Sequence, residues 1–256
     1  REVIQDGLHA LHGGNADDGQ GGGKDLANGG DERQPGLSER GVVRDKESLR
    51  FIPGAAGEQG MEGGREIAQV MGAAGSEWLE RDNRDQEENT SLALSKIPLK
   101  PNSTVADIGA GTGYYSFKLA AKLPQGKLYA VEIQDELIEY LRQRKAAQGD
   151  KIITVVKSSA GSANLPENSV DLAIMVDVYH ELEFPWEMIQ SIRKSLRPDG
   201  KLLLLEYRGE DPSVPIKALH KTTVAQLNRE LGASGFRLAY KGDFLPIQHF
   251  LLYEKK

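Results

Sequence analysis

The sequence predicts an α/β fold: a doubly wound, mostly parallel seven-stranded sheet with an antiparallel hairpin at one edge. From residue 103 onward, strand-like apolar runs alternate with helix-like segments, which is the pattern of a parallel sheet covered by helices. The central runs are almost continuously apolar, as expected of parallel strands that are buried on both faces. The last two strand-like runs, within 236–256, have no helix between them and should therefore pair as the hairpin.

The apolar runs locate five strands before this hairpin, at residues 103–109, 127–133, 151–157, 169–177 and 201–207. Four helices are expected around them, at residues 114–123, 135–149, 185–197 and 222–235. Pro185 suits the first turn of the third helix, and a Pro-Asp-Gly turn should follow that helix at 198–200. Thr223 and Gln226 form a capping box for the fourth helix, which should break at Gly232.

A helix, a break and a second helix are expected before the first strand. Ile67, Val70 and Met71 have the i, i+3, i+4 spacing of one helical face. Pro98 and Pro101 should end this region.

The composition divides the chain near residue 65. The first 64 residues hold 16 of the 29 glycines and have neither helical nor strand periodicity. Such a segment cannot bury enough apolar area to offset the entropy of ordering it. The prediction is a disordered or irregular segment over 1–64, followed by one folded domain over 65–256.

Composition also excludes several classes of function. The formal net charge of -6 disfavours a nucleic-acid partner. The chain has no cysteine, which excludes disulfides, thiolate metal sites and cysteine nucleophiles and is compatible with a cytoplasmic location. The longest aliphatic run, at 202–205, is far too short to span a membrane. Because residue 1 is Arg rather than Met, the sequence leaves open whether a leader segment precedes it.

A glycine-rich loop, "VADIGAGTGYYS", joins the first strand to the next helix. Such a turn lets the backbone approach a ligand at the carboxyl edge of the sheet, where the helix N-terminus adds partial positive charge. Dinucleotides require G-x-G-x-x-G, but Tyr114 stands where the third glycine should be. An NAD(P)-dependent oxidoreductase is therefore a rival interpretation that the spacing disfavours.

The actual spacing, D-x-G-x-G-x-G from Asp107 to Gly113, resembles motif I of the class I S-adenosylmethionine-dependent methyltransferases. The resemblance extends over residues 65–256 and implies the Rossmann-like fold of that family and S-adenosylmethionine as cofactor. An acidic residue at the end of the second strand binds the ribose hydroxyls in this family, and Glu132 matches it in place and type. The expected cofactor contacts are Asp107, Gly109, Ala110, Gly111, Gly113, Glu132, Ile133, Ser159 and Asp177.

One family feature is only partly present. After the third strand, "NLPENSVD" matches the family, but Ser158, Ser159 and Ala160 stand where an acid usually contacts the adenine. The Ser159 hydroxyl or backbone groups are expected to make that contact instead. The missing acid is also the support for a third interpretation, a non-catalytic protein that binds S-adenosylmethionine.

The segment "MVDVYHE" at 175–181 follows the fourth strand, and it should line the cofactor and the methyl acceptor. His180 is either a general base or a histidine that packs beneath the cofactor. Tyr207 and the loop 209–221 leave the fifth strand at the same edge, and His220 in that loop is a second candidate base. The loop is either a basic lid that favours an anionic or phenolic acceptor, or a solvated connector. His180, His220 and Tyr207 are the catalytic candidates.

No metal site is expected, because His180, His220 and His249 are scattered along the sequence. The segments "MVDVYHE" and "EYRGEDPSVPIK" resemble a narrower group of bacterial methyltransferases. The predicted function is methyl transfer to an unidentified acceptor, a small molecule in preference to a protein. Neither a nucleic acid nor a membrane component is expected as a partner. The oligomeric state stays open.

Overall fold

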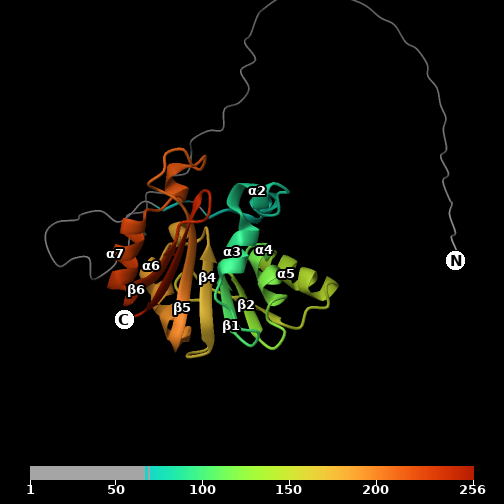
Figure 1. The fold of residues 1–256 in the computed structure, drawn as a ribbon. Coiled ribbons are helices and arrows are strands. Elements are labelled where there is room, and N and C mark those ends of the chain that lie inside the picture. The colour runs from blue at the N-terminus through green and yellow to red at the C-terminus, as the bar shows by residue number, and fades with distance from the viewer. Residues whose placement is uncertain (1–66, 69) are drawn as a thin grey trace, which may run out of the picture. The chain divides into compact units, whose positions relative to one another are not determined.

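The computed structural model describes residues 67, 68 and 70–256, and these residues contain one seven-stranded sheet (Figure 1). The strand order is β3-β2-β1-β4-β5-β7-β6. The strands are β1 (Thr104–Ile108), β2 (Lys127–Glu132), β3 (Ile153–Lys157), β4 (Val170–Val176), β5 (Leu196–Tyr207), β6 (Phe236–Gly242) and β7 (Gln248–Lys255). The glycine-rich segment 1–64 lies outside the described residues, so its expected irregularity stays a prediction.

The pairing confirms the predicted topology. β1 pairs in parallel with both β2 and β4, and β4 pairs in parallel with β5. β7 is antiparallel to both β5 and β6, so the last two strands form the expected hairpin at one edge. The strand order reverses between β1 and β4, and ligands of doubly wound sheets bind at the carboxyl ends of the strands beside such a reversal.

Helices cover both faces of the sheet. Side chains of α3 (Thr90–Lys96), α4 (Tyr114–Ala120) and α5 (Asp135–Ala147) share one apolar core with the sheet. Side chains of α6 (Pro185–Ser195) and α7 (Val224–Ala233) share the core on the other face. Figure 1 shows α2 (Arg84–Glu88) and the orange segment that contains η3 (Ala218–His220) at the same end of the sheet.

Two local predictions are wrong: the turn at 198–200 and the helix break at Gly232. The predicted turn at 198–200 lies inside β5, where the pairing shifts from Val170–Leu196 to Leu172–Lys201 and leaves the intervening residues as a bulge. Helix α7 continues past Gly232 and ends before Gly235, whose φ of 86° provides the left-handed stop. The Thr223 cap is confirmed, because its side chain accepts a hydrogen bond from the backbone N–H of Gln226.

The segment before β1 also differs from the expectation. No helix includes Ile67, Val70 or Met71, and the described residues of 67–72 have no regular secondary structure. The 3₁₀ turn η1 (Ala73–Gly75) and the short helix α1 (Ser76–Leu79) follow, then α2 and α3. Backbone groups of this segment bond to the sheet edge instead: the Ala68 N–H donates to the His180 carbonyl, and the Met71 carbonyl accepts from Gln134 Nε2.

Candidate cofactor and acceptor site

The glycine loop has a backbone that ordinary residues rarely adopt. Gly109, Gly111 and Gly113 have φ values of 72°, 55° and 85°. The loop is also crowded: a Cβ on Gly109 would lie 2.6 Å from a methyl of Val178, and one on Gly111 would lie 2.9 Å from Leu79. Glycine is therefore required at these positions both for the backbone conformation and for space.

Asp107 lies at the start of this loop and is buried under α4. Its carboxylate accepts a hydrogen bond of 2.6 Å from the Ser116 hydroxyl. Burial raises the pKa of Asp107 to about 6, although the Ser116 bond opposes this shift. The side chain is thus held in place against the first turn of the helix that follows the loop.

Glu132 is buried at the end of β2 and binds the glycine loop directly. One carboxylate oxygen accepts from the Gly111 N–H at 2.8 Å. The other accepts from the N–H groups of Ile133 and Gln134, at 2.7 and 3.0 Å. A carboxylate has about four acceptor sites, so these three bonds leave capacity for a ligand hydroxyl.

Ile133 and Ser159 lie beside this corner. Ile133 is 41% exposed. The Ser158 N–H donates to the Glu132 carbonyl, and Ser159 pairs with Ser162 in a short bridge. The loop after β3 therefore begins next to Glu132, as the predicted adenine contact requires.

Asp177 leaves β4 with a φ of 54°, a strained value for a non-glycine residue. Gln248 at the start of β7 donates to one of its carboxylate oxygens at 2.7 Å. The other oxygen is buried without a hydrogen-bond partner, as is the side-chain oxygen of Gln248. Burial, together with the negative charges of Glu88 and Glu206, raises the pKa of Asp177 well above its usual range.

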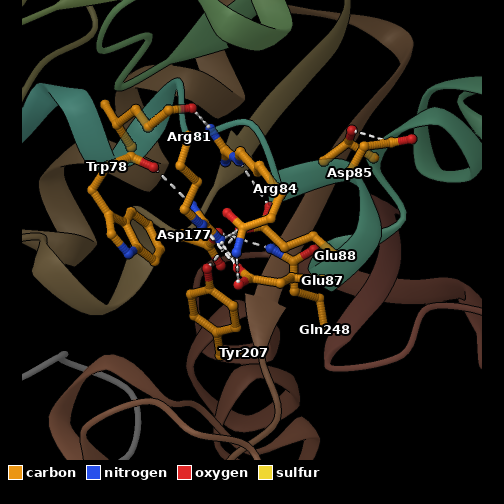
Figure 2. Close-up of polar contacts among 12 residues, drawn as sticks. Trp78, Arg81, Arg84, Asp85, Glu87, Glu88, Asp177, Tyr207 and Gln248 are labelled. Atoms are coloured by element: carbon orange, nitrogen blue, oxygen red, sulfur yellow. Dashed lines mark hydrogen bonds and ion pairs between the residues drawn. The ribbon is translucent and has the colours of Figure 1, made fainter.

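A buried ionic cluster lies next to Asp177 and connects α2 to the sheet edge (Figure 2). Glu88 is fully buried and accepts from Arg81 Nη2 at 2.6 Å, Arg84 Nε at 2.9 Å and the Tyr207 hydroxyl at 2.8 Å. Burial and the nearby carboxylates raise the pKa of Tyr207. The Tyr207 hydroxyl is therefore bonded to Glu88 of α2, and the catalytic role of Tyr207 stays a prediction.

The two other catalytic candidates lie together. His180 is in η2 (Tyr179–Glu181), directly after β4, and His220 is in η3, in the loop after β5. His180 Nε2 lies 3.1 Å from His220 Nδ1. The other nitrogen of His180, Nδ1, lies 2.7 Å from a carboxylate oxygen of Glu206, which is fully buried at the end of β5. Glu181 Oε1 lies 3.9 Å from His180 Nε2 and 3.8 Å from His220 Nδ1.

Charges in this group are strongly coupled. Burial alone disfavours the imidazolium of His180, but the carboxylates of Glu206, Asp177 and Glu181 together raise its pKa. Burial and the neighbouring His180 charge lower the pKa of His220. Burial raises the pKa of Glu181 to about 7, although His180 opposes this shift. His180 therefore holds a proton more tightly than His220 does.

The expectation that the three histidines are scattered is wrong for two of them. His180 and His220 are 40 residues apart in the sequence but in contact in the fold, because the loop after β5 turns back over η2. His249 is separate from this pair and bonds to Glu210 at 2.9 Å.

Sequence reasoning gave no role to three groups at the site: Glu206, Glu181 and the α2 ion pairs. Glu206 follows the apolar run of β5 directly, so an acid at the carboxyl end of a buried strand was a usable signal. Glu88 and Arg84 are separated by one helical turn within an otherwise polar segment, and nothing in that local pattern distinguishes a buried pair from an exposed one.

The comparisons with known proteins agree with this geometry. Residues 106–202 match a family model described as a methyltransferase domain. The chain is 28% identical over 154 residues to a malonyl-[acyl-carrier protein] O-methyltransferase of Methylococcus capsulatus, covering 53% of this chain and 52% of that protein. It is 39% identical over 77 residues to a protein-L-isoaspartate O-methyltransferase of Aeropyrum pernix, covering 30% of each. The chain thus spans about half the length, or less, of these curated relatives.

Solved structures share the fold. A S-adenosylmethionine-dependent methyltransferase from Aquifex aeolicus superposes with a TM-score of 0.67 at 22% identity, covering 72% of this chain and 98% of that one. No helix among the residues that the structure describes is long and apolar enough to cross a membrane. Residues 106–202 thus match a methyltransferase domain, and the described residues share the fold of a S-adenosylmethionine-dependent methyltransferase.

Proposed function

We propose that this protein transfers the methyl group of S-adenosylmethionine to a small molecule with an ionisable hydroxyl, such as a phenol or an enol. The observation that supports this proposal is that the glycine loop and the His180–His220 pair lie at the same edge of the sheet. The glycine loop follows β1, and the His180–His220 pair is built from the segments after the neighbouring strands β4 and β5. A cofactor bound at the loop would therefore lie beside groups that can receive a proton.

The proposed cofactor contacts are those of the glycine loop and its surroundings. Glu132, already fixed by three backbone N–H groups, would accept hydrogen bonds from the ribose hydroxyls. Exposed Ile133 would pack on the adenine, and Ser159 would border it. Asp177, with one buried oxygen that lacks a donor, would bind the cofactor ammonium or the acceptor. The remaining proposed contacts are Asp107, Gly109, Ala110, Gly111 and Gly113.

The reaction is an in-line displacement at the methyl carbon. The acceptor oxygen forms a bond to that carbon while the carbon–sulfur bond breaks, and the sulfur keeps the electron pair. A hydroxyl acceptor must lose its proton. His220 Nε2 would receive it when His220 Nδ1–H donates to His180 Nε2 and His180 Nδ1–H donates to Glu206. The sulfonium supplies the leaving group, so the protein contributes positioning and proton transfer.

Related proteins do not identify the acceptor. The chain is 27% identical over 132 residues to a ubiquinone/menaquinone biosynthesis C-methyltransferase of Ectopseudomonas mendocina, which by its name methylates carbon, and covers 49% of it. The malonyl-[acyl-carrier protein] O-methyltransferase by its name methylates oxygen. The His180–His220 pair favours the acceptors that have a proton to lose, since a carboxylate acceptor needs no base.

The first test is isothermal titration with S-adenosylmethionine, S-adenosylhomocysteine and NADH. We expect both sulfur ligands to bind and NADH not to bind. Glu132→Ala should abolish this binding, whereas Glu136→Ala, an exposed acid in the first turn of α5, should not change it. A wild-type protein that binds neither sulfur ligand would overturn the proposal, and one that binds NADH instead would favour an oxidoreductase.

The second test measures transfer of a labelled methyl group to a panel of phenols, enols and carboxylic acids. We expect incorporation into the first two classes. Cofactor binding with no transfer to any member of a broad panel would favour the non-catalytic alternative.

A further inference from the structure

We propose that His180, Glu181 and His220 form a binding site for one divalent transition-metal ion of the zinc type. The site would lie on the acceptor side of the sheet edge, where η2 and η3 meet. Metal binding itself rests only on these side chains, whereas its role in activating the acceptor rests on the proposed methyltransferase function.

The ligand atoms already converge. His180 Nε2 and His220 Nδ1 are 3.1 Å apart, and Glu181 Oε1 is 3.9 and 3.8 Å from them. Two nitrogen ligands of a tetrahedral zinc ion lie about 3.3 Å apart, because each bond is about 2.0–2.1 Å long. A small inward movement of the Glu181 carboxylate would complete three ligands around one ion.

A buried acid fixes the central ligand in the correct orientation. Glu206 accepts from His180 Nδ1 with one oxygen and from the N–H groups of Val178 and Tyr179 with the other. The bond to Nδ1 directs Nε2 toward His220 and Glu181. A carboxylate that holds the second nitrogen of a histidine is the usual outer partner of a metal-bound imidazole, and it also raises the basicity of the ligand.

The donor set selects the kind of metal. Two imidazole nitrogens and one carboxylate suit zinc and its first-row neighbours, whereas calcium and magnesium require mostly oxygen ligands. Three protein ligands leave one position of a tetrahedral ion open, which is the arrangement of catalytic rather than structural zinc. The open side is toward His220, whose side chain is 32% exposed, against 3% for His180 and 14% for Glu181.

This site would give the acceptor a second means of activation. An acceptor hydroxyl bound at the open position loses its proton to solvent more readily, because the metal stabilises the oxyanion. The oxyanion then forms its bond to the methyl carbon as the carbon–sulfur bond breaks, and the electron pair stays on sulfur. With metal bound, His180 and His220 act as ligands and do not accept the proton.

Zinc binding to the full chain tests the site. The protein is stripped with a chelator, titrated with Zn²⁺ in the calorimeter against a competing chelator, and its metal content is measured after gel filtration. His9 and His12 are changed to Gln in every sample so that zinc bound by these two histidines is not counted. We expect one Zn²⁺ per chain and at least a tenfold loss of affinity in Glu181→Gln and in His220→Asn.

The control is His249→Gln, which alters a second histidine–glutamate pair outside the cluster. This variant should bind Zn²⁺ as the parent does. Circular dichroism confirms that each variant is folded. Absence of zinc binding, or equal affinity in the parent, Glu181→Gln and His220→Asn, would overturn the metal site. S-adenosylhomocysteine is titrated into the same samples, so that loss of cofactor binding with zinc binding intact counts against the proposed function alone.

Discussion

Gly109 shows at the scale of one residue why the loop requires glycine. Its φ of 72° and the close approach of Val178 are separate obstacles to a side chain. Gly149 has a similar φ of 61°, but a Cβ there would have no atom within 4 Å, so this position isolates the backbone effect. Gly149→Ala should lower the free energy of unfolding by about 1–2 kcal/mol.

Gly109→Ala should lower the free energy of unfolding by roughly 2–4 kcal/mol, because the contact with Val178 adds an overpacking cost to the same backbone cost. Urea denaturation of both variants measures the difference. Calorimetry should also show weaker S-adenosylhomocysteine binding for Gly109→Ala alone. Equal losses of stability and unchanged binding in the two variants would show that the contact with Val178 is unimportant.

Asp107 predicts a pH-dependent stability. Its pKa in the folded protein, about 6, is higher than in an unfolded chain, so the folded state holds the proton more tightly. The protonated Asp107 carboxyl therefore adds to the free energy of unfolding at low pH, and this addition is lost as the pH rises through 6. From about pH 4.5 to about pH 7.5 it should fall by about 2 kcal/mol.

Asp107→Asn removes this titration. The unfolding free energy of the variant minus that of the wild type should therefore increase by the same amount over the same pH range, as measured by urea denaturation at both ends. A difference that does not change with pH would mean that Asp107 keeps an ordinary pKa in the fold.

His220 is the residue through which the catalytic proposal is tested most cleanly, because it is more exposed than His180. His220→Asn should reduce kcat by about 10²–10⁴-fold with a hydroxyl acceptor. S-adenosylhomocysteine affinity should stay unchanged, since the glycine loop and Glu132 are intact. His249→Asn serves as the matched control, and a similar loss of kcat in both variants would argue against a specific role for His220.

At the scale of elements, the short helices α1 and α2 are held on the sheet edge by charge rather than by apolar area. Glu88 accepts hydrogen bonds from two arginines and from Tyr207 of β5, as Figure 2 shows. Removing one partner of a buried ion pair leaves an uncompensated charge, which costs about 3–5 kcal/mol.

Glu88→Ala should therefore lower the free energy of unfolding by that amount, and proteolysis should cut earliest around α2. Glu87→Ala removes a second partner of Arg81 that is 43% exposed, so it should cost no more than about 1 kcal/mol. Chemical denaturation and limited proteolysis compare the two variants. Similar behaviour of both would mean that α2 is held by other contacts.

At the scale of the whole molecule, cofactor binding should stabilise the fold. The proposed contacts come from β1, β2 and β4 and from the loops after β1, β2, β3 and β4, so a bound ligand would connect segments that separate on unfolding. S-adenosylhomocysteine at 100 times its dissociation constant should add about 2.7 kcal/mol to the free energy of unfolding. Thermal unfolding measures this shift, and NADH at the same concentration should leave the melting temperature unchanged.

Most of the sheet was predictable because local patterns determine it. Continuous apolar runs identified the parallel strands, and the absence of a helix within 236–256 identified the hairpin. The region before β1 was mispredicted because Ile67, Val70 and Met71 match a helical stripe, while backbone bonds to His180 and Gln134 hold the segment in an irregular path. Periodicity does not register such long-range bonds.

The contact between the glycine loop and Glu132 was also predictable, since both belong to one strand–helix–strand unit with defined spacing. The acceptor side of the site was not. His180, Glu206 and His220 come from the segments around three different elements, and their contact depends on how the loop after β5 turns back over η2.

The sequence by itself thus determined the α/β fold, the resemblance to methyltransferases and the loop proposed to receive the cofactor, because these features depend on residue patterns within short, continuous segments. Only the tertiary structure decided which side chains meet at the acceptor side. It paired His180 with His220, placed Glu206 behind them and buried Tyr207 against Glu88. The physical reason is that hydrogen bonds and ion pairs act over a few ångströms in space, whatever the separation of the residues along the chain.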